Sequence, residues 1–201
     1  MADWEFGFLA AELNTGRYFK EGLARVEVRT VATEVTPILT MGGIWILPDL
    51  SLDELDPREA LLLVLPGGEG WLDESHARAI AKAGEFLSAS VLVAAICGAT
   101  LGLGAAGLLD SRDHTSNDLG YMKAVCPAYR GETRYREKPA VRDGGLITAS
   151  GIAPLEFTHL VLESLDLVDA DALDGWLGLY RSHESRYYFQ LMESLPKMKS
   201  A

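Results

Sequence analysis

Apolar runs alternate with helix-like segments along this chain. Ala60–Leu65 and Ser90–Ile96 are apolar at nearly every position, which suits strands of a parallel sheet covered on both faces. Asp73–Ala89 and Thr100–Leu108 follow these runs and have the composition and spacing of helices. Strands that alternate with helices predict an α/β fold, a flavodoxin-like three-layer α/β/α sandwich with a mostly parallel sheet.

The rest of the chain fits the same plan, and no repeat or low-complexity linker divides it. Residues 1–201 are therefore expected to form a single domain. The patterns predict strands at Val26–Val31, Ile44–Leu47 and Ser111–Thr115, a strand–turn–strand unit over Val141–Thr148, and helices at Asp3–Phe19, Asp118–Val125, Pro154–Leu165 and Ala170–Glu193.

Charge and cysteine content narrow the class of protein. A formal net charge of −11 makes nucleic acids and anionic membrane surfaces poor partners. The longest apolar runs are far short of a membrane span, and the acidic opening Met1–Glu5 has no signal-peptide character. Two cysteines and four histidines, without ligand-like spacing, predict no metal site, no disulfide framework and no cofactor. We therefore expect a reduced, cytoplasmic protein.

The strongest chemical signal lies between a predicted strand and a predicted helix. Ala95-Ile96-Cys97-Gly98-Ala99 has the small-x-nucleophile-x-small layout of a nucleophile elbow, in which a strained turn needs small neighbours two residues away. Cys97 would then project beside a helix N-terminus, where oriented N–H groups favour the thiolate. The alternative is an inert cysteine buried in the core.

A glycine pair follows the preceding strand. Gly67 and Gly68 come directly after Pro66, and their N–H groups, with that of Gly98, are candidates to bind an oxyanion near the thiol. The alternative is a tight turn that needs glycine for its backbone conformation.

Four segments in order resemble the landmarks of the ThiJ/PfpI family, which includes the parkinsonism-associated deglycase and is also described as class I glutamine amidotransferase-like. They are Leu65–Gly68, Ala94–Ala99, Gly107–Leu109 and Asp143–Gly151. The resemblance runs from about Asp3 to about Leu165. It implies a flavodoxin-like fold, a homodimer, and a cysteine that reacts with a small-molecule substrate or an oxidant. Members include glyoxalase or deglycase-type enzymes, peptidases, stress proteins and isocyanide hydratases.

The resemblance also implies a partner for the thiol. The family places a glutamate beside the cysteine, and Glu5 in Asp3-Trp4-Glu5 matches it. Glu5 shares a helix face with Leu9 and Leu13, so we expect it to be partly buried; burial favours the protonated carboxyl, which can donate a hydrogen bond to sulfur. Without the resemblance, Glu5 is an acidic residue in a first helical turn.

The chain departs from the family pattern at the histidine that many members carry about twenty residues after the cysteine. That register falls on Asn117, which cannot act as a general base. His114 reaches the site only in a different register. Asp118 is the other polar neighbour, with the alternative role of a helix N-cap. An ordinary Cys–His hydrolase is therefore not favoured.

A second departure concerns the start of the fold. The resemblance implies a strand before Asp3, but the chain has no room for it after Met1, so either another segment fills that place or the start lies further upstream. Cys126 remains open as a resolving thiol for Cys97 or a loop cysteine.

The sequence alone leaves three alternative functions open. The first is a cysteine-dependent enzyme that acts on small carbonyl or amide electrophiles in a stress response. The second is a redox-sensing protein in which Cys97 is oxidised. The third is a binding dimer that keeps the fold and has lost the chemistry.

Overall fold

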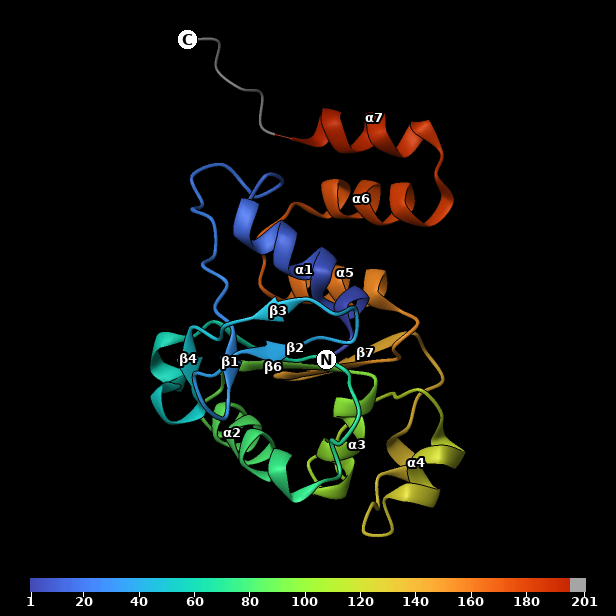
Figure 1. The fold of residues 1–201 in the computed structure, drawn as a ribbon. Helices are drawn as coiled ribbons and strands as arrows, with labels where there is room; N and C mark the ends of the chain where they lie inside the picture. Colours follow the sequence, from blue (N-terminus) through green and yellow to red (C-terminus); the bar gives the residue numbers. More distant parts are fainter. Residues whose placement is uncertain (196–201) are drawn as a thin grey trace.

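A four-stranded sheet forms the centre of the fold in the computed structural model, which describes residues 1–195 (Figure 1). The strand order is β5 (Leu62–Leu65), β6 (Leu92–Ile96), β8 (Leu146–Ala149) and β7 (Ala140–Asp143). β5, β6 and β8 are parallel, and β7 runs antiparallel beside β8. The mostly parallel sheet and the Val141–Thr148 strand–turn–strand unit are thus confirmed.

Helices cover both faces of this sheet. Leu92, Ala94 and Ile96 of β6 pack on one side, while Val93 and Ala95 pack on the other, because successive side chains of a strand point in opposite directions. The first side is covered by α1 (Asp3–Thr15) and α5 (Pro154–Ser164), with α6 (Ala170–Ser182) and α7 (Ser185–Ser194) stacked outside them. The second side is covered by α2 (Ala77–Ser88), α3 (Gly98–Ala105) and α4 (Leu119–Val125) (Figure 1). The three-layer α/β/α sandwich predicted from the sequence is therefore observed.

Two predicted helices end earlier than expected, and each end has a local cause. α1 stops at Gly16, which adopts a left-handed conformation and donates its N–H to the carbonyl of Glu12. The predicted helix Ala170–Glu193 is wrong as a single element, because His183 is left-handed at φ 59° and reverses the chain. α7 consequently folds back along α6, where Tyr187 lies against Gly178 and leaves no room for a side chain there.

Two predicted strands are also wrong for most of their length. Of the predicted strand Val26–Val31 only Val31 pairs, as part of β1 (Val31–Ala32), which runs parallel to β4 (Leu50–Ser51). Val26 instead donates its N–H to the carbonyl of Leu13, so its backbone is satisfied by the end of α1. The Ser111–Thr115 segment contributes a single β-bridge, between His114 and Tyr135.

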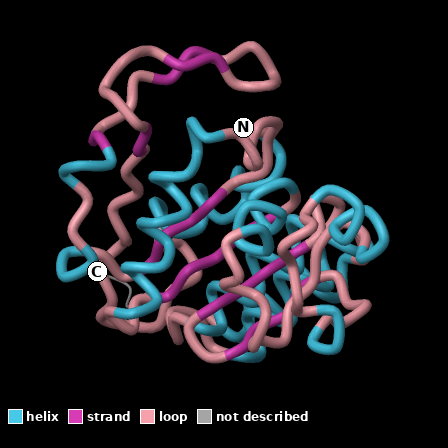
Figure 2. Tube along the Cα trace, turned by 90° about the horizontal axis from the view of Figure 1, so that it is seen from below, coloured by secondary structure: helices cyan, strands magenta, loops and turns pink. Residues whose placement is uncertain are grey.

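A small hairpin lies at the margin of the molecule, apart from the four-stranded sheet (Figure 2). It pairs β2 (Ile38–Leu39) with β3 (Trp45–Ile46), the latter within the predicted strand Ile44–Leu47. The hairpin tip is tied to the chain start: Gly42 donates its N–H to Asp3 Oδ2 at 2.6 Å, and Met41 donates to the Met1 carbonyl at 3.0 Å.

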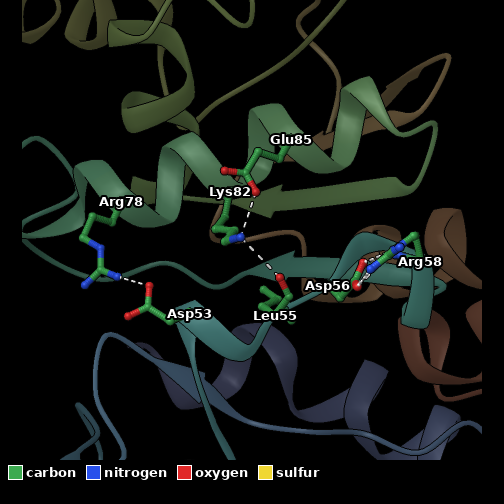
Figure 3. A network of polar contacts seen from close by, with 7 residues as sticks. All are labelled: Asp53, Leu55, Asp56, Arg58, Arg78, Lys82 and Glu85. Carbon is green, nitrogen blue, oxygen red and sulfur yellow. Dashed lines mark hydrogen bonds and ion pairs between the residues drawn. The ribbon is translucent and has the colours of Figure 1, made fainter.

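Polar contacts link the segment that precedes β5, which includes Asp53 and Leu55, to α2 (Figure 3). Arg78 pairs with Asp53, and Lys82 bonds both the carbonyl of Leu55 at 3.3 Å and Glu85 at 2.8 Å. Exposed ion pairs contribute under about 1 kcal/mol each, so they orient this connection rather than hold the fold together. No helix within residues 1–195 has the length and apolar character to cross a bilayer.

Candidate active site around Cys97

Cys97 occupies a strained turn where β6 meets α3. Its φ and ψ are 59° and −126°, a combination that costs a residue with a side chain on the order of 1–3 kcal/mol. The surroundings hold it there: its N–H donates to the Ala149 carbonyl at 2.9 Å, and its own carbonyl accepts from Thr100 N at 3.1 Å and Thr100 Oγ1 at 2.6 Å. The backbone thus has the geometry of a nucleophile elbow.

Glu5 approaches the same point from the first turn of α1, and its side chain is fully buried. Its Oε2 accepts a hydrogen bond from Gly67 N–H at 2.5 Å. This contact corrects the sequence prediction for Gly67, because its N–H serves the carboxyl group and is not free for an oxyanion. The other carboxyl oxygen of Glu5, Oε1, is buried and has no hydrogen-bond partner among residues 1–195.

Two glycines allow Glu5 and Cys97 to come together. A Cβ on Gly67 would lie 2.2 Å from Glu5 Oε2 and 2.6 Å from Cys97 Cβ. A Cβ on Gly151 would lie 2.7 Å from Cys97 Sγ and 3.0 Å from Glu5 Oε1. Any side chain at either position would displace the thiol or the carboxyl, so these two glycines are needed for close approach.

Asn117, directly before the N-cap of α4, also contacts the sulfur. Its Nδ2 donates to Cys97 Sγ at 3.2 Å, while its Oδ1 accepts from Gly151 N at 2.8 Å and from Ser150 Oγ at 3.3 Å. The orientation of the amide is fixed, because a backbone N–H can only donate and must face the oxygen. Asn117 is thereby committed to donating toward the thiol.

Burial is the largest influence on the pKa of both groups of the pair. Burial raises the pKa of the Glu5 carboxyl, because a negative charge is poorly solvated there. Burial also raises the pKa of the Cys97 thiol, Glu5 raises it further, and the N–H donors of Asn117 and Gly98 lower it. At the thiol, burial and the Glu5 carboxyl therefore act against the N–H donors of Asn117 and of Gly98 at the start of α3.

His114 and Asp118 have structural partners instead. His114 is fully buried, with Nδ1 against the Arg112 carbonyl at 2.7 Å and Nε2 against Tyr129 Oη at 2.6 Å. Both ring nitrogens are occupied, so His114 is a core histidine, and the different register that would have brought it to the thiol is not the one observed. Asp118 caps α4 by accepting from Tyr121 N–H at 2.6 Å.

Cys126 is a free thiol that packs away from this chemistry. It is 2% exposed, and its Sγ lies 3.5 Å from the Leu101 carbonyl in the core between α3 and α4. Cys97 is likewise free. Within residues 1–195, no group of three or more His, Cys, Asp or Glu side chains lies close enough together to bind a metal ion.

A cavity of about 620 Å³ opens beside Asn117. Ser150 and Ile152 from the loop after β8 line it together with Asp118, Tyr135 and Lys138. Its volume suits a small molecule. Sequence reasoning missed Ser150 and Ile152, which line this cavity, and Gly151, which bonds Asn117, although the Asp143–Gly151 motif that carries Ser150 and Gly151 was noticed for its resemblance.

This combination of a mostly parallel α/β sandwich and a cysteine on a nucleophile elbow defines a class of flavodoxin-like proteins with a thiol at the carboxyl edge of the sheet. The chain belongs to the DJ-1/PfpI family, whose sequence profile matches residues 1–164.

Relatives extend the match over nearly the whole chain. It is 50% identical over 195 residues to a Bacillus subtilis protein described as "Uncharacterized protease YoaZ", covering 97% of this chain and 93% of the relative. A ThiJ/PfpI family protein from Bacillus anthracis has a solved structure with a TM-score of 0.95 at 52% identity, covering 98% of this chain and 93% of that one. The DJ-1 superfamily protein Atu0886 from Agrobacterium tumefaciens gives a TM-score of 0.78 at 38% identity, covering 91% and 94%.

Proposed function

We propose that this protein is a cysteine-dependent enzyme that acts on small carbonyl electrophiles. Cys97 is the nucleophile, and Glu5 is the group that accepts and donates the proton. The observation that carries the proposal is the position of Cys97 Sγ between a buried carboxyl group and the Asn117 amide, which donates to it at 3.2 Å. Membership of the DJ-1/PfpI family supports a reactive cysteine at this place.

The first step needs only groups that surround the sulfur. Cys97 Sγ forms a bond to the carbonyl carbon, and the electron pair of the C=O π bond moves to oxygen. The proton held by the Cys97–Glu5 pair passes through the Glu5 carboxyl to that oxygen and completes a hemithioacetal. The N–H groups of Gly68 and Gly98 are proposed to receive the developing oxyanion, since the N–H of Gly67 is taken by Glu5.

A 2-oxoaldehyde allows the reaction to be completed. The hydrogen on the former aldehyde carbon moves as a proton, through Glu5, to the neighbouring carbonyl carbon. The oxygen of that carbonyl gains the proton that the hemithioacetal hydroxyl gives up, and the carbon bound to sulfur becomes a thioester. Water then cleaves the C–S bond, returning the thiol proton and releasing a 2-hydroxy acid. The net change is the addition of one water to the substrate.

Amide cleavage is less well supported by the same residues. The leaving amine must be protonated and a water activated, and both tasks suit a group that titrates near neutrality. Asn117 occupies the place beside the sulfur and has no such titration. We therefore place carbonyl addition ahead of the peptide hydrolysis suggested by the names of the Bacillus subtilis relatives.

The test compares Cys97→Ser with Cys126→Ser, using methylglyoxal as the 2-oxoaldehyde. We expect Cys97→Ser to lose formation of the 2-hydroxy acid to background, while Cys126→Ser retains it because that thiol lies in the core. A chromogenic anilide offered to the same variants measures amidase activity. Turnover of methylglyoxal that survives in Cys97→Ser would remove the proposal.

Redox sensing is the second candidate, favoured by the unpartnered Glu5 Oε1 beside the sulfur. Here the Cys97 thiolate attacks a peroxide oxygen, the O–O bond breaks, and hydroxide takes a proton as sulfenic acid forms. Intact-mass spectra after mild peroxide should show oxygen added at Cys97 and less of it in Glu5→Gln. Equal oxidation of Cys126 would count against sensing, and inertness in both assays would leave a binding dimer.

We further propose a stress-response role in the cytoplasm, a single domain over residues 1–201, and a homodimer. The two free thiols support a reducing compartment. The packing of Trp176 and Leu191, from α6 and α7, into the same core as Leu9 of α1 supports one domain. Microscopy of the tagged chain, limited proteolysis and sedimentation test these three points in turn.

A further inference from the structure

The cavity beside Asn117 is larger than a small 2-oxoaldehyde needs. Its volume is about 620 Å³, which lies within the range of pockets that enclose ligands of drug size. Methylglyoxal carries only a methyl group beyond its two carbonyls and would leave most of this space to water. Asn117 lines the cavity and also donates to Cys97 Sγ at 3.2 Å, so a substrate bound to the sulfur can extend into it. The cavity is therefore a candidate site for the unreactive tail of the substrate.

Ser150 and Tyr135 carry hydroxyl groups that a ligand in the cavity can reach, because both side chains line it and are half-buried. Both groups have already given their protons to the protein. Ser150 Oγ donates to Asn117 Oδ1 at 3.3 Å, and Tyr135 Oη donates to the carbonyl of Ser116 at 3.3 Å. A hydroxyl whose proton is engaged retains only its lone pairs. Toward a ligand, both groups therefore act as hydrogen-bond acceptors.

The charged side chains of the lining add further acceptors. The carboxylates of Asp118 and Glu137 can only accept hydrogen bonds. Lys123 in the lining already donates to Glu132 at 2.6 Å. Lys138 is exposed, and it lies next in the chain to the opposite charge of Glu137. The lining therefore favours a tail that donates hydrogen bonds, and its carboxylates disfavour a tail that is anionic.

We propose that the substrate of this site is a 2-oxoaldehyde with a hydroxylated tail, an assignment that rests on the carbonyl chemistry proposed for Cys97. Hydroxyl groups along the tail donate to Ser150, Tyr135 and Glu137, while the aldehyde carbon lies against the sulfur. The reaction is unchanged: one water is added overall, and the tail keeps all its bonds. A site whose polar groups bind a substrate hydroxyl discriminates against an analogue that lacks it. Because these groups are partly exposed, water replaces a missing hydroxyl, and each hydrogen bond adds a preference of only about tenfold.

Ile152 is the feature of the cavity that favours a different tail. Its side chain is part of the lining and is 94% exposed, so an apolar tail would gain free energy by covering it. A single exposed apolar residue is ordinary on a protein surface, however, and carries less weight than several convergent acceptors. An apolar tail of similar size is therefore the competitor against which the hydroxylated tail must be measured.

Initial rates with methylglyoxal, phenylglyoxal and 3-deoxyglucosone, whose tail bears three hydroxyl groups, test the proposal. We expect kcat/KM of the wild-type chain for 3-deoxyglucosone to exceed that for the other two by about tenfold or more. Glu137→Ala and Tyr135→Phe should each reduce this preference by about three- to tenfold, because each removes one acceptor. Lys138→Ala truncates the neighbouring side chain of opposite charge and should retain the preference. A wild-type preference for phenylglyoxal or methylglyoxal, or a preference for 3-deoxyglucosone that only Lys138→Ala removes, overturns the proposal.

Calorimetry with the two product acids, 3-deoxyhexonate and lactate, separates a failure of this proposal from a failure of the proposed reaction, because their binding needs no turnover. Tighter binding of 3-deoxyhexonate than of lactate, weakened in Glu137→Ala, supports the tail site even if none of the three aldehydes is consumed. Equal binding of the two acids contradicts the tail site. Turnover of methylglyoxal would in that case leave the carbonyl chemistry of Cys97 intact.

Discussion

Asn117 donates a hydrogen bond to Cys97 across a separation of 3.2 Å, from a position twenty residues further along the chain. The bond stabilises negative charge on the sulfur without offering a site for the thiol proton, because the amide nitrogen cannot accept it. In the proposed mechanism, acid–base work at the thiol therefore falls to the Glu5 carboxyl. The assignment of the two roles to two different side chains leads to separate predictions.

Asn117→Asp should make the thiol less reactive. The substitution preserves the side-chain shape but removes the donor and places a negative charge beside the sulfur, so the pKa of Cys97 should rise further. We expect alkylation by iodoacetamide at neutral pH to slow by about tenfold, measured as a pH–rate profile. Asn14→Asp makes the same chemical change at the exposed end of α1 and is the control, because it lies outside the site. Its pH–rate profile should stay that of the wild type, and equal profiles of the two variants would contradict the prediction.

Glu5→Gln should separate reactivity from turnover. Removal of the carboxylate charge lowers the pKa of Cys97, so the alkylation midpoint should move to lower pH. Turnover of a 2-oxoaldehyde should fall by about 10²–10⁴-fold, because the proton shuttle is lost. Glu85→Gln on the exposed face of α2 is the control. An alkylation midpoint that stays in place would show that Glu5 does not act on the thiol.

The same residue predicts a pH dependence of stability. The pKa of Glu5 is raised in the folded state from an ordinary value of 4.5, so its stabilising contribution is full below about pH 4.5 and is lost as pH rises through the folded pKa. The free energy of unfolding of the wild-type chain, relative to Glu5→Gln, should therefore fall as pH increases above that point. Urea titrations between pH 4 and 8 measure the difference, and a constant or growing advantage of the wild type would disagree.

Cys97 contributes with the same sign but in another pH range. Its pKa is raised above an ordinary value of 9.0, so the stability it adds is retained below that pH and lost above it. Titrations that stop at pH 8 consequently report Glu5 without interference from the thiol.

Gly151→Ala should damage the site through sterics alone. The new methyl group would lie 2.7 Å from Cys97 Sγ, closer than carbon approaches sulfur, and 3.0 Å from Glu5 Oε1, tighter than most contacts of a Cβ atom. We expect a loss of about 1–3 kcal/mol in unfolding free energy and a large fall in alkylation rate. Gly7→Ala, where nothing lies within 4 Å in the interior of α1, should stabilise the fold by about 0.5–1 kcal/mol. Equal effects of the two substitutions would refute the crowding at Cys97.

The sequence allowed the layers of the fold to be predicted because they depend on local patterns. The apolar run of β6 and the Pro154 start of α5 can be recognised without their neighbours. The strand predicted at Val26–Val31 was wrong because a strand also needs a neighbouring strand to pair with, and most of this segment has no such neighbour. The break between α6 and α7 at His183 was not predicted, because a residue other than glycine that adopts a left-handed conformation cannot be recognised from the sequence.

The candidate site shows the same division. Cys97 and Asn117 follow from motif and register, and the structure brings them into contact. That Gly67 serves Glu5, and that Gly151 orients Asn117, depend on the directions of individual N–H groups, which no residue pattern encodes. Glu12 was unforeseen for a related reason: it is 3% exposed and bonds Trp176 Nε1 at 2.9 Å, a partner 164 residues away.

The backbone of Cys97 reverses an ordinary rule of protein engineering. Replacement of alanine by glycine normally destabilises a protein, because glycine loses more conformational freedom on folding. At φ 59° and ψ −126° the side chain itself is the source of strain. Of two inert variants, Cys97→Gly should therefore unfold at higher urea than Cys97→Ala, by about 1–3 kcal/mol. Selection for stability alone would thus favour glycine here, so the proposed nucleophile occupies its position at a cost in stability.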